Sequence, residues 1–302
     1  MLQQLNGLSF LPNKQTLRGI ILMSCGTFLF SIVDAIARIV STHYPPNEIT
    51  FFRMLFGLVP AAYMLGRHGV GERDVTLHRF FGHFMRAVTA LSARVLFFAA
   101  LPHLPLSTAV ALQYIEVIFI GLFAVVFLSE RFHLSTAVAS IVGFFGVVLI
   151  SLPLTGIKGS LTAMSLVLLS AMFGAGSIIQ VKKLCRTEDP AAIVFYFTII
   201  ATILSGMSLF VAWVTPNAKD FGYMALIGLT AGAGQLLLTA ALANTAASLL
   251  APLGYFGVVW AIVFEYLIWG DSISTQTAVG FVAITGSALY LCMFAKQADA
   301  VE

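Results

Sequence analysis

Charged residues are scarce in this sequence of 302 residues, because Asp, Glu, Lys and Arg together make up only 10% of it. A soluble domain carries about 25% of such residues, so a soluble fold is excluded. Hydrophobic residues make up 59% of the chain, and its mean hydropathy is +0.97. Apolar surface on this scale needs a lipid environment, which predicts an all-α integral membrane protein.

The sequence also lacks the motifs of enzymatic and metal-dependent chemistry. It contains no phosphate-binding loop of the form GxxxxGK[ST] and no HExxH zinc motif. Its three cysteines and six histidines show no metal-ligand spacing. We therefore expect a protein that is not an enzyme and has no cofactor and no metal. Its expected partners are a small-molecule substrate and the lipid bilayer, with no nucleic acid.

Long apolar runs separated by short polar segments predict ten transmembrane helices, since one crossing of the bilayer needs about 20 apolar residues. Prolines, glycines and charged residues separate the runs. The expected spans are residues 18–41, 48–66, 80–101, 106–129, 134–152, 160–182, 191–214, 221–242, 247–269 and 275–295.

Lysines and arginines of the predicted loops fall almost entirely on one side of the membrane. With the N-terminus inside, the outer loops hold only Lys158 and Lys219. The inner segments hold Lys14, Arg18, Arg67, Arg73, Arg79, Arg131, Lys182, Lys183, Arg186 and Lys296. Positive charge favours the cytoplasmic side, so we expect a multi-pass protein of the bacterial inner membrane with both termini in the cytoplasm. This orientation requires an even number of spans.

An internal repeat divides the chain into two halves. A shift of 141 positions aligns residues 96–139 with 237–280 without a gap, and a shift of 144 aligns Pro46 with Pro190. We therefore expect two repeats of five helices, residues 1–153 and 154–302. Because five is odd, the second repeat must cross the membrane in the opposite direction to the first. Such inverted repeats place a substrate site between them near the middle of the bilayer.

Two motifs stand out: an arginine early in the second helix of the first half, and in both halves an acidic residue after the fourth helix, followed by spaced glycines. They read Phe51-Phe52-Arg53, Leu128-Ser129-Glu130 with Gly143 and Gly146, and Trp269-Gly270-Asp271 with Gly280 and Gly286. In this the chain resembles the EamA-type exporters of the drug/metabolite transporter superfamily. Ser129, Asp271 and Phe197 depart from the family pattern, since Phe197 stands where the second repeat would carry its arginine.

The resemblance implies a ten-helix exporter and a structural role for Arg53, Glu130 and Asp271. It further implies export of small metabolites, aromatic and other neutral amino acids in particular, by alternating access through a central cavity. An uptake carrier of the same fold is the alternative reading, and a membrane-embedded enzyme is a remote one.

Charged side chains within spans usually face a cavity or a partner, because exposing them to lipid is expensive. Asp34 and Arg38 are four residues apart on one helical face, so they form either an ion pair or a gate. Arg53 lies near the start of its helix, where we expect its long side chain to reach the interface.

Arg94 lies deep in its expected span, and Gln235 stands at the equivalent position of the second repeat. These two either bind substrate or bond to neighbouring carbonyls. Glu116 either neutralises Arg94 or takes part in proton exchange.

Tyr114 and Tyr255 are equivalent under the 141-residue shift. Each offers a ring for apolar surface and a hydroxyl for orientation, so we expect both to line the cavity, with helix packing as the alternative. The spacing Gly228-x-x-x-Gly232 is typical of close contact between membrane helices.

The charge distribution makes a first testable prediction about topology. A reporter that is active only in the periplasm should stay silent when it is fused after Ala300, because both termini are expected in the cytoplasm. Strong reporter activity at that position would contradict the ten-span arrangement.

Overall fold

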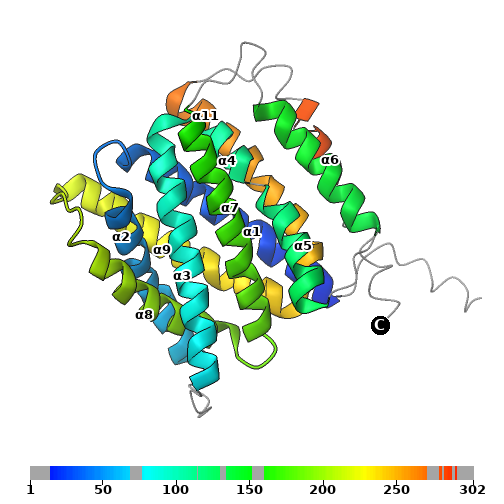
Figure 1. Cartoon of the computed structure of the whole chain (residues 1–302), viewed down its shortest axis with the longest axis horizontal. Helices are drawn as coiled ribbons and strands as arrows, with labels where there is room; N and C mark the ends of the chain where they lie inside the picture. Colours follow the sequence, from blue (N-terminus) through cyan, green and yellow to red (C-terminus); the bar gives the residue numbers. More distant parts are fainter. Residues whose placement is uncertain are drawn as a thin grey trace, which may run out of the picture.

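The protein is described here by a computed structural model that covers residues 14–68, 77–113, 115–129, 134–151, 160–270, 279–280, 282–287 and 290. Its named elements are all helices, linked by short turns, and no strand occurs among the described residues. The helices run side by side as one bundle (Figure 1). This confirms the all-helical class expected from composition.

Eleven α-helices and two short 3-10 helices follow one another along the described chain. They are α1 (Lys14–Val40), α2 (Pro46–His68), α3 (Leu77–Ala100), η2 (Leu101–His103), α4 (Leu106–Gln113), α5 (Glu116–Leu128), α6 (Leu134–Ser151), α7 (Leu161–Leu184), α8 (Pro190–Ser208), α9 (Ala218–Asn244), α10 (Ala247–Leu250), η3 (Ala251–Tyr255) and α11 (Phe256–Trp269).

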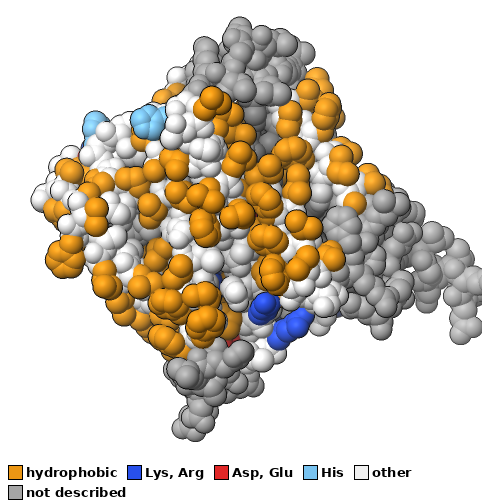
Figure 2. Space-filling model, in the orientation of Figure 1, with side chains coloured by type: hydrophobic (Ala, Val, Ile, Leu, Met, Phe, Trp, Pro, Cys, Tyr) orange, Lys and Arg blue, Asp and Glu red, His pale blue; other side chains and the backbone are white. Residues whose placement is uncertain are grey.

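Six of these helices, namely α1, α2, α3, α7, α8 and α9, are individually long and apolar enough to cross a membrane. Shorter apolar helices occupy three further expected spans, at 106–129, 134–152 and 247–269. The tenth expected span, 275–295, lies largely outside the described residues. The protein is therefore a multi-pass membrane protein, and the face in view in Figure 2 is covered by hydrophobic side chains over α3, α5, α7 and α8.

Helix boundaries recur along the chain at the spacings of the sequence repeat. The starts of α2 and α8, Pro46 and Pro190, differ by 190 − 46 = 144 positions. The starts of α3 and α9 differ by 218 − 77 = 141, as do the starts of α4 and α10 (247 − 106 = 141) and the ends of α5 and α11 (269 − 128 = 141). The two halves thus use the same local structure.

The ends of α5 and α11 share one unusual conformation. Ser129 and Gly270 follow these helices with φ of 56° and 74°, in the left-handed region, and their amides donate to carbonyls of the last turn. Glycine suits this cap because it lacks a Cβ, whereas serine adopts it at a conformational cost. Ser129 therefore stands where the backbone would favour the glycine that the family pattern contains.

The expected spans 106–129 and 247–269 are both interrupted helices. The first breaks between α4 and α5, at the turn around Ile115, and the second passes through the 3-10 helix η3. Under the 141-residue shift, Ile115 corresponds to Phe256, so both interruptions end at equivalent places, directly before α5 and α11. Unwound segments inside a membrane bundle occur where protein or a cavity satisfies the backbone.

The packing of helices against one another is also equivalent in the two halves. The helix α1 packs along α9, and its counterpart α7 packs along α3 (Figure 1). Because α9 corresponds to α3, exchanging the two halves turns the first pair into the second. Likewise α5 packs on α7, as α11 packs on α1. The centre of the bundle is therefore built from helices of both halves.

Glycines bring α9 against α2, which confirms the close packing predicted from their spacing. A Cβ at Gly228 would meet the Phe56 side chain and lie 2.7 Å from the carbonyl oxygen of Phe52. A Cβ at Gly232 would lie 2.7 Å from the carbonyl oxygen of Gly57. Since the obstacles are backbone atoms, these positions tolerate no side chain without separating the helices.

Gly228→Ala should therefore lower the thermal unfolding midpoint of the purified protein in detergent, because overpacking costs roughly 1–3 kcal/mol. Gly222→Ala is the matched control on the same helix, since a Cβ there meets nothing within 4 Å. The control should keep or raise the midpoint, because alanine is favoured over glycine in a helix by about 1 kcal/mol. Equal midpoints for both variants would contradict the close α2–α9 contact.

Candidate functional site

Four charged side chains from four helices lie within electrostatic range of one another inside the bundle. Asp34 on α1 interacts electrostatically with Arg53 on α2 and Arg94 on α3, and Glu116 at the start of α5 interacts with Arg94 and Asp34. We call these four residues the central charge cluster. Two acidic and two basic side chains thus share one region of the bundle, and charged groups within membrane spans commonly occur together in this way.

An aromatic ring lies near both arginines of the cluster. The guanidinium carbons of Arg53 and Arg94 are 5.9 and 6.0 Å from the centre of the Phe30 ring, one turn before Asp34 on α1. Both distances are within the range of a cation–π interaction. The cluster therefore presents an apolar face alongside its charges.

Glu116 is held in place by a chain of polar contacts through α4 and α7. Gln113 donates to Glu116 Oε2 at 2.9 Å. Ser170 Oγ lies 2.9 Å from Gln113 Oε1 and 2.8 Å from the carbonyl oxygen of Ala93, next to Arg94. A Cβ at Gly174 would lie 2.6 Å from Glu116 Oε1, so the glycine provides the room that the carboxylate occupies.

Arg53 is more deeply buried than the sequence suggested. We expected its side chain to reach the interface, but Arg53 is 5% exposed and faces Phe30. That expectation was wrong because depth along a helix does not reveal which face of the helix points inward. Arg94 is half-buried, so it is the more accessible guanidinium of the cluster.

Arg38 pairs with a different acid from the one expected. Its Nη1 lies 2.8 Å from Glu265 Oε1 on α11, and its guanidinium carbon is 4.3 Å from the centre of the Trp269 ring. The expected pair with Asp34 is therefore corrected. Arg38 joins α1 to α11, which leaves Asp34 to the arginines of the cluster.

Tyr255 is fully buried against α6 instead of lining the central charge cluster. Its hydroxyl donates to the carbonyl oxygen of Ser140 at 3.0 Å, and its ring lies directly over Gly143, where a Cβ would collide with it. This position agrees with the alternative stated for Tyr255, a role in helix packing.

Tyr114, the counterpart of Tyr255, lies outside the described residues, as do Glu130 and Asp271. Gln235 is half-buried on α9, next to Gly234, whose Cβ would lie 3.3 Å from Phe30.

The bundle is tied together at one end by the turn after α1. Tyr44 donates from its hydroxyl to Asp220 Oδ2 on α9 at 2.9 Å, and Glu48 Oε2 accepts from the amide of Val214 at 2.9 Å. Asn47 donates to the carbonyl oxygens of Ser208 and Ala212. The segment between α8 and α9 is thereby fixed to α2.

A second tie involves the equivalent elements of the other half. Glu188, in the turn between α7 and α8, lies 3.0 Å from His83 Nε2 near the start of α3. Glu188 and Tyr44 are 188 − 44 = 144 positions apart, the shift that relates the two turns. Tyr44–Asp220 therefore joins the turn between α1 and α2 to α9. His83–Glu188 joins the corresponding turn between α7 and α8 to α3, the counterpart of α9.

Sequence reasoning missed several of these residues. His83, Arg86 and Glu188 form a second buried polar group, and Gln113 and Ser170 support Glu116. Arg86 could have been found, because it is a second arginine inside the expected span 80–101 and the argument applied to Arg94 applies to it as well. The pairing of His83 with Glu188 has no sequence signal, because 105 residues separate the two.

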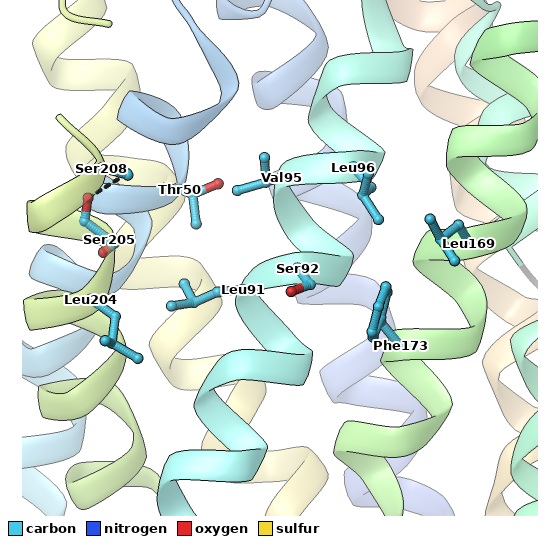
Figure 3. Close-up of a pocket in the computed structure, with 10 residues that line it drawn as sticks. All are labelled: Thr50, Leu91, Ser92, Val95, Leu96, Leu169, Phe173, Leu204, Ser205 and Ser208. Carbon is cyan, nitrogen blue, oxygen red and sulfur yellow. Dashed lines mark hydrogen bonds between the residues drawn. The ribbon is translucent and has the colours of Figure 1, made fainter. Parts of the chain in front are cut away.

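A separate cavity of about 470 Å³ lies among α2, α3, α7 and α8 (Figure 3). Its lining residues are Thr50, Leu91, Ser92, Val95, Leu96, Leu169, Phe173, Leu204, Ser205 and Ser208. The hydroxyls of Thr50, Ser205 and Ser208 donate to carbonyls of their own helices. None of the lining residues belongs to the central charge cluster, so this cavity offers mainly apolar surface.

Comparison with known proteins identifies a family model that matches the chain twice. The model described as the EamA-like transporter family matches residues 17–152 and 161–293. A solved crystal structure that is 16% identical superposes with a TM-score of 0.77, covering 92% of this chain and 98% of the other. That likeness shows the fold alone.

Three curated relatives of the chain are named as transporters. The pseudopaline exporter CntI of Pseudomonas aeruginosa is 28% identical, over 90% of this chain and 95% of its own length. A riboflavin transporter of Brucella anthropi is 28% identical, over 83% and 89%. An S-adenosylmethionine uptake transporter of Rickettsia felis is 24% identical, over 92% and 95%.

The burial of Tyr255 makes a prediction that separates packing from binding. Tyr255→Ala should lower the thermal unfolding midpoint, because removing a buried aromatic ring costs roughly 3–5 kcal/mol. Tyr255→Phe should cost only about 1 kcal/mol, since it keeps the ring and removes one hydrogen bond. Thermal unfolding of the two purified variants measures both effects. An Ala variant as stable as the unaltered protein would contradict the packing role.

Proposed function

Because this chain belongs to the EamA-like transporter family, we propose that it exports a small zwitterionic metabolite, an amino acid in the first place, by alternating access. Transport of small molecules is the activity of its named relatives, and the chain is a transporter and not an enzyme. The substrate class, the direction and the mechanism are the proposal. The central charge cluster is the observation that carries it.

The cluster offers complementary groups for both ends of an amino acid. Arg94 is a planar donor that binds a carboxylate through two parallel hydrogen bonds. Asp34 and Glu116 are acids that bind an ammonium group, and both lie within electrostatic range of Arg94. Phe30 supplies an aromatic face beside them, which suits the apolar side chains of aromatic and other neutral amino acids. Gln235 on α9, next to Gly234, stays a candidate.

The repeat supports a site at this place. We propose ten spans in two inverted repeats, residues 1–153 and 154–302, because the helix boundaries recur at 141 and 144 residues and five spans per repeat reverse the second one. In transporters built from inverted repeats, substrate binds near the middle of the bilayer at the repeat interface. Asp34, Arg53, Arg94 and Glu116 come from four helices of the first repeat, which pack against α7 and α9 of the second.

The two ties suit the ends of an alternating-access cycle. We propose that the tie between Tyr44 and Asp220 closes the periplasmic end and that the tie between His83 and Glu188 closes the cytoplasmic end. The excess of lysine and arginine on the predicted inner segments supports this orientation, with both termini in the cytoplasm of a bacterial inner membrane. Each half-cycle would break one tie and keep the other.

Relatives of this chain include one named for export and one named for uptake. Direction therefore has to be measured, and uptake by the same fold is the alternative. Everted vesicles and intact cells loaded with substrate, tested under opposite gradients, separate these two directions. Net movement only into the cell would contradict export.

The function itself is tested with the full-length protein reconstituted in liposomes. We expect counterflow of radiolabelled L-phenylalanine and of other neutral amino acids, with the label recovered in chemically unchanged form. Empty liposomes give the background. Failure of every amino acid to exchange would contradict the proposed substrate class, and chemical conversion of the label would instead favour a membrane enzyme.

Arg94→Ala should reduce this counterflow at least tenfold while the protein still reaches the membrane, because it removes the proposed carboxylate donor. Arg94→Lys should recover it only in part, since an ammonium group cannot form the paired hydrogen bonds. Arg67→Ala is the matched control, because Arg67 is exposed at the end of α2, away from the central charge cluster, and its guanidinium interacts with Tyr63 one turn earlier on the same helix. Full transport by a monodisperse Arg94→Ala protein would end this assignment.

A further inference from the structure

A second guanidinium is fully buried in the first half of α3, two helical turns before Arg94. Arg86 is 0% exposed, donates from Nη1 to the carbonyl oxygen of Ile193 on α8 at 2.9 Å, and lies 4.1 Å above the centre of the Phe197 ring. Its Nε and Nη2 have no hydrogen-bond partner in the part of the chain that the structure describes.

These two free donors share one edge of the guanidinium. The N–H groups of Nε and Nη2 point in the same direction, and this edge binds a carboxylate by two parallel hydrogen bonds. Leaving a charged donor buried and unsatisfied costs more than an ordinary hydrogen bond returns. A membrane protein that keeps such an edge vacant in one conformation is expected to use it in another.

The surroundings of Arg86 complete the chemistry of a zwitterion site. Glu188 interacts electrostatically with Arg86 and contacts His83 through Oε2, while its Oε1 and His83 Nδ1 are also buried without a partner among the described residues. Burial raises the pKa of the nearby Cys185 thiol to about 11, so this group stays neutral and cannot serve as the counter-ion of Arg86. One carboxylate and one vacant guanidinium edge therefore lie together.

The same group of residues is closed in this structure. His83 and Arg86 are buried, the Glu188 side chain is 7% exposed, and the contact between His83 and Glu188 joins α3 to the turn between α7 and α8. This tie is the equivalent of the one between Tyr44 and Asp220 at the other end of the bundle. Opening it would expose the guanidinium edge and the freed carboxylate at the same time.

We propose that Arg86 and Glu188 form a second substrate position at the cytoplasmic end of α3, where the carboxylate and the ammonium group of an amino acid dock before they reach the central charge cluster. This rests on the proposed function and on its orientation. Arg86 and Arg94 lie on the same helix eight residues apart, about 12 Å along the axis at 1.5 Å per residue. A substrate carboxylate thus passes from one guanidinium to the next along α3.

The structural alternative is that Arg86 only holds α3 against α8 through Ile193 and Phe197. Two variants separate the readings. Arg86→Lys keeps the charge and one donor for Ile193 but loses the paired donors. Phe197→Leu is the matched control, because it removes the stacked ring and leaves the guanidinium edge intact.

The test measures the half-saturating concentration of L-phenylalanine from each face of the membrane, with the full-length protein. With the cytoplasmic face outward, in everted vesicles, Arg86→Lys should raise it about tenfold, while from the periplasmic face it should stay within about twofold of the unaltered protein. Phe197→Leu should leave both values unchanged. Arg94→Lys should raise both, because the central charge cluster serves both faces.

Glu188→Gln provides a second arm that leaves the guanidinium untouched. It should also raise the half-saturating concentration from the cytoplasmic face alone, and it carries the test if Arg86→Lys does not reach the membrane. The second position would be overturned if Glu188→Gln leaves the half-saturating concentration from the cytoplasmic face unchanged and Arg86→Lys either leaves it unchanged as well or cannot be measured. No phenylalanine transport by the unaltered protein would instead overturn the proposed function, and this inference with it.

Discussion

Compensation of charge inside the membrane is the constraint on which the rest of this structure depends. An isolated ion in a medium of low dielectric constant is very costly, so every charged side chain within the spans needs an opposite charge or polar partners nearby. Asp34 interacts electrostatically with Arg53 and Arg94, Glu116 interacts with Arg94, and Arg38 forms an ion pair with Glu265. These partners come from different helices, so the charges can be compensated only when α1, α2, α3, α5 and α11 are assembled. Charge pairing therefore specifies the register of the bundle as well as its centre.

Glycine makes this assembly possible, because charges can be paired only where backbones come close enough. Gly174 leaves room for the Glu116 carboxylate on α7, and Gly228 and Gly232 bring α9 against α2. A membrane interior supplies no hydrophobic force between helices, so packing and polar contacts have to hold them together. The small residues and the charges thus depend on each other: a side chain at Gly174 would displace the acid that compensates Arg94.

The sequence was most informative where local structure decides the outcome. The repeat register predicted equivalent helices, and the structure begins α2 and α8, and then α3 and α9, at 144 and 141 residues apart, because proline, turn and apolar patterns are local signals. Partners were harder to predict. Arg38 has Asp34 one turn away but pairs with Glu265, 227 residues distant, because a tertiary partner competes with a local pair four residues apart that contributes only a few tenths of a kcal/mol in isolated helices. Tyr255 was placed in a cavity because a tyrosine suits either location, and Gly143 gave no sign that it accepts the ring.

The buried donors of Arg86 that have no hydrogen-bond partner among the described residues link the fold to the proposed transport mechanism. A protein selected for stability alone would pair or replace a buried arginine, because a well-packed apolar residue is often no less stable there. Arg86 instead keeps one edge vacant beside His83 and Glu188, next to a turn that the repeat relates to the turn bearing Tyr44. Unsatisfied polar groups raise the free energy of the closed conformation, and a ligand that satisfies them lowers the free energy of the open one. In the mechanism proposed above, a tie at each end, one of them beside a vacant guanidinium, would make the equilibrium between conformations depend on substrate, which alternating access requires.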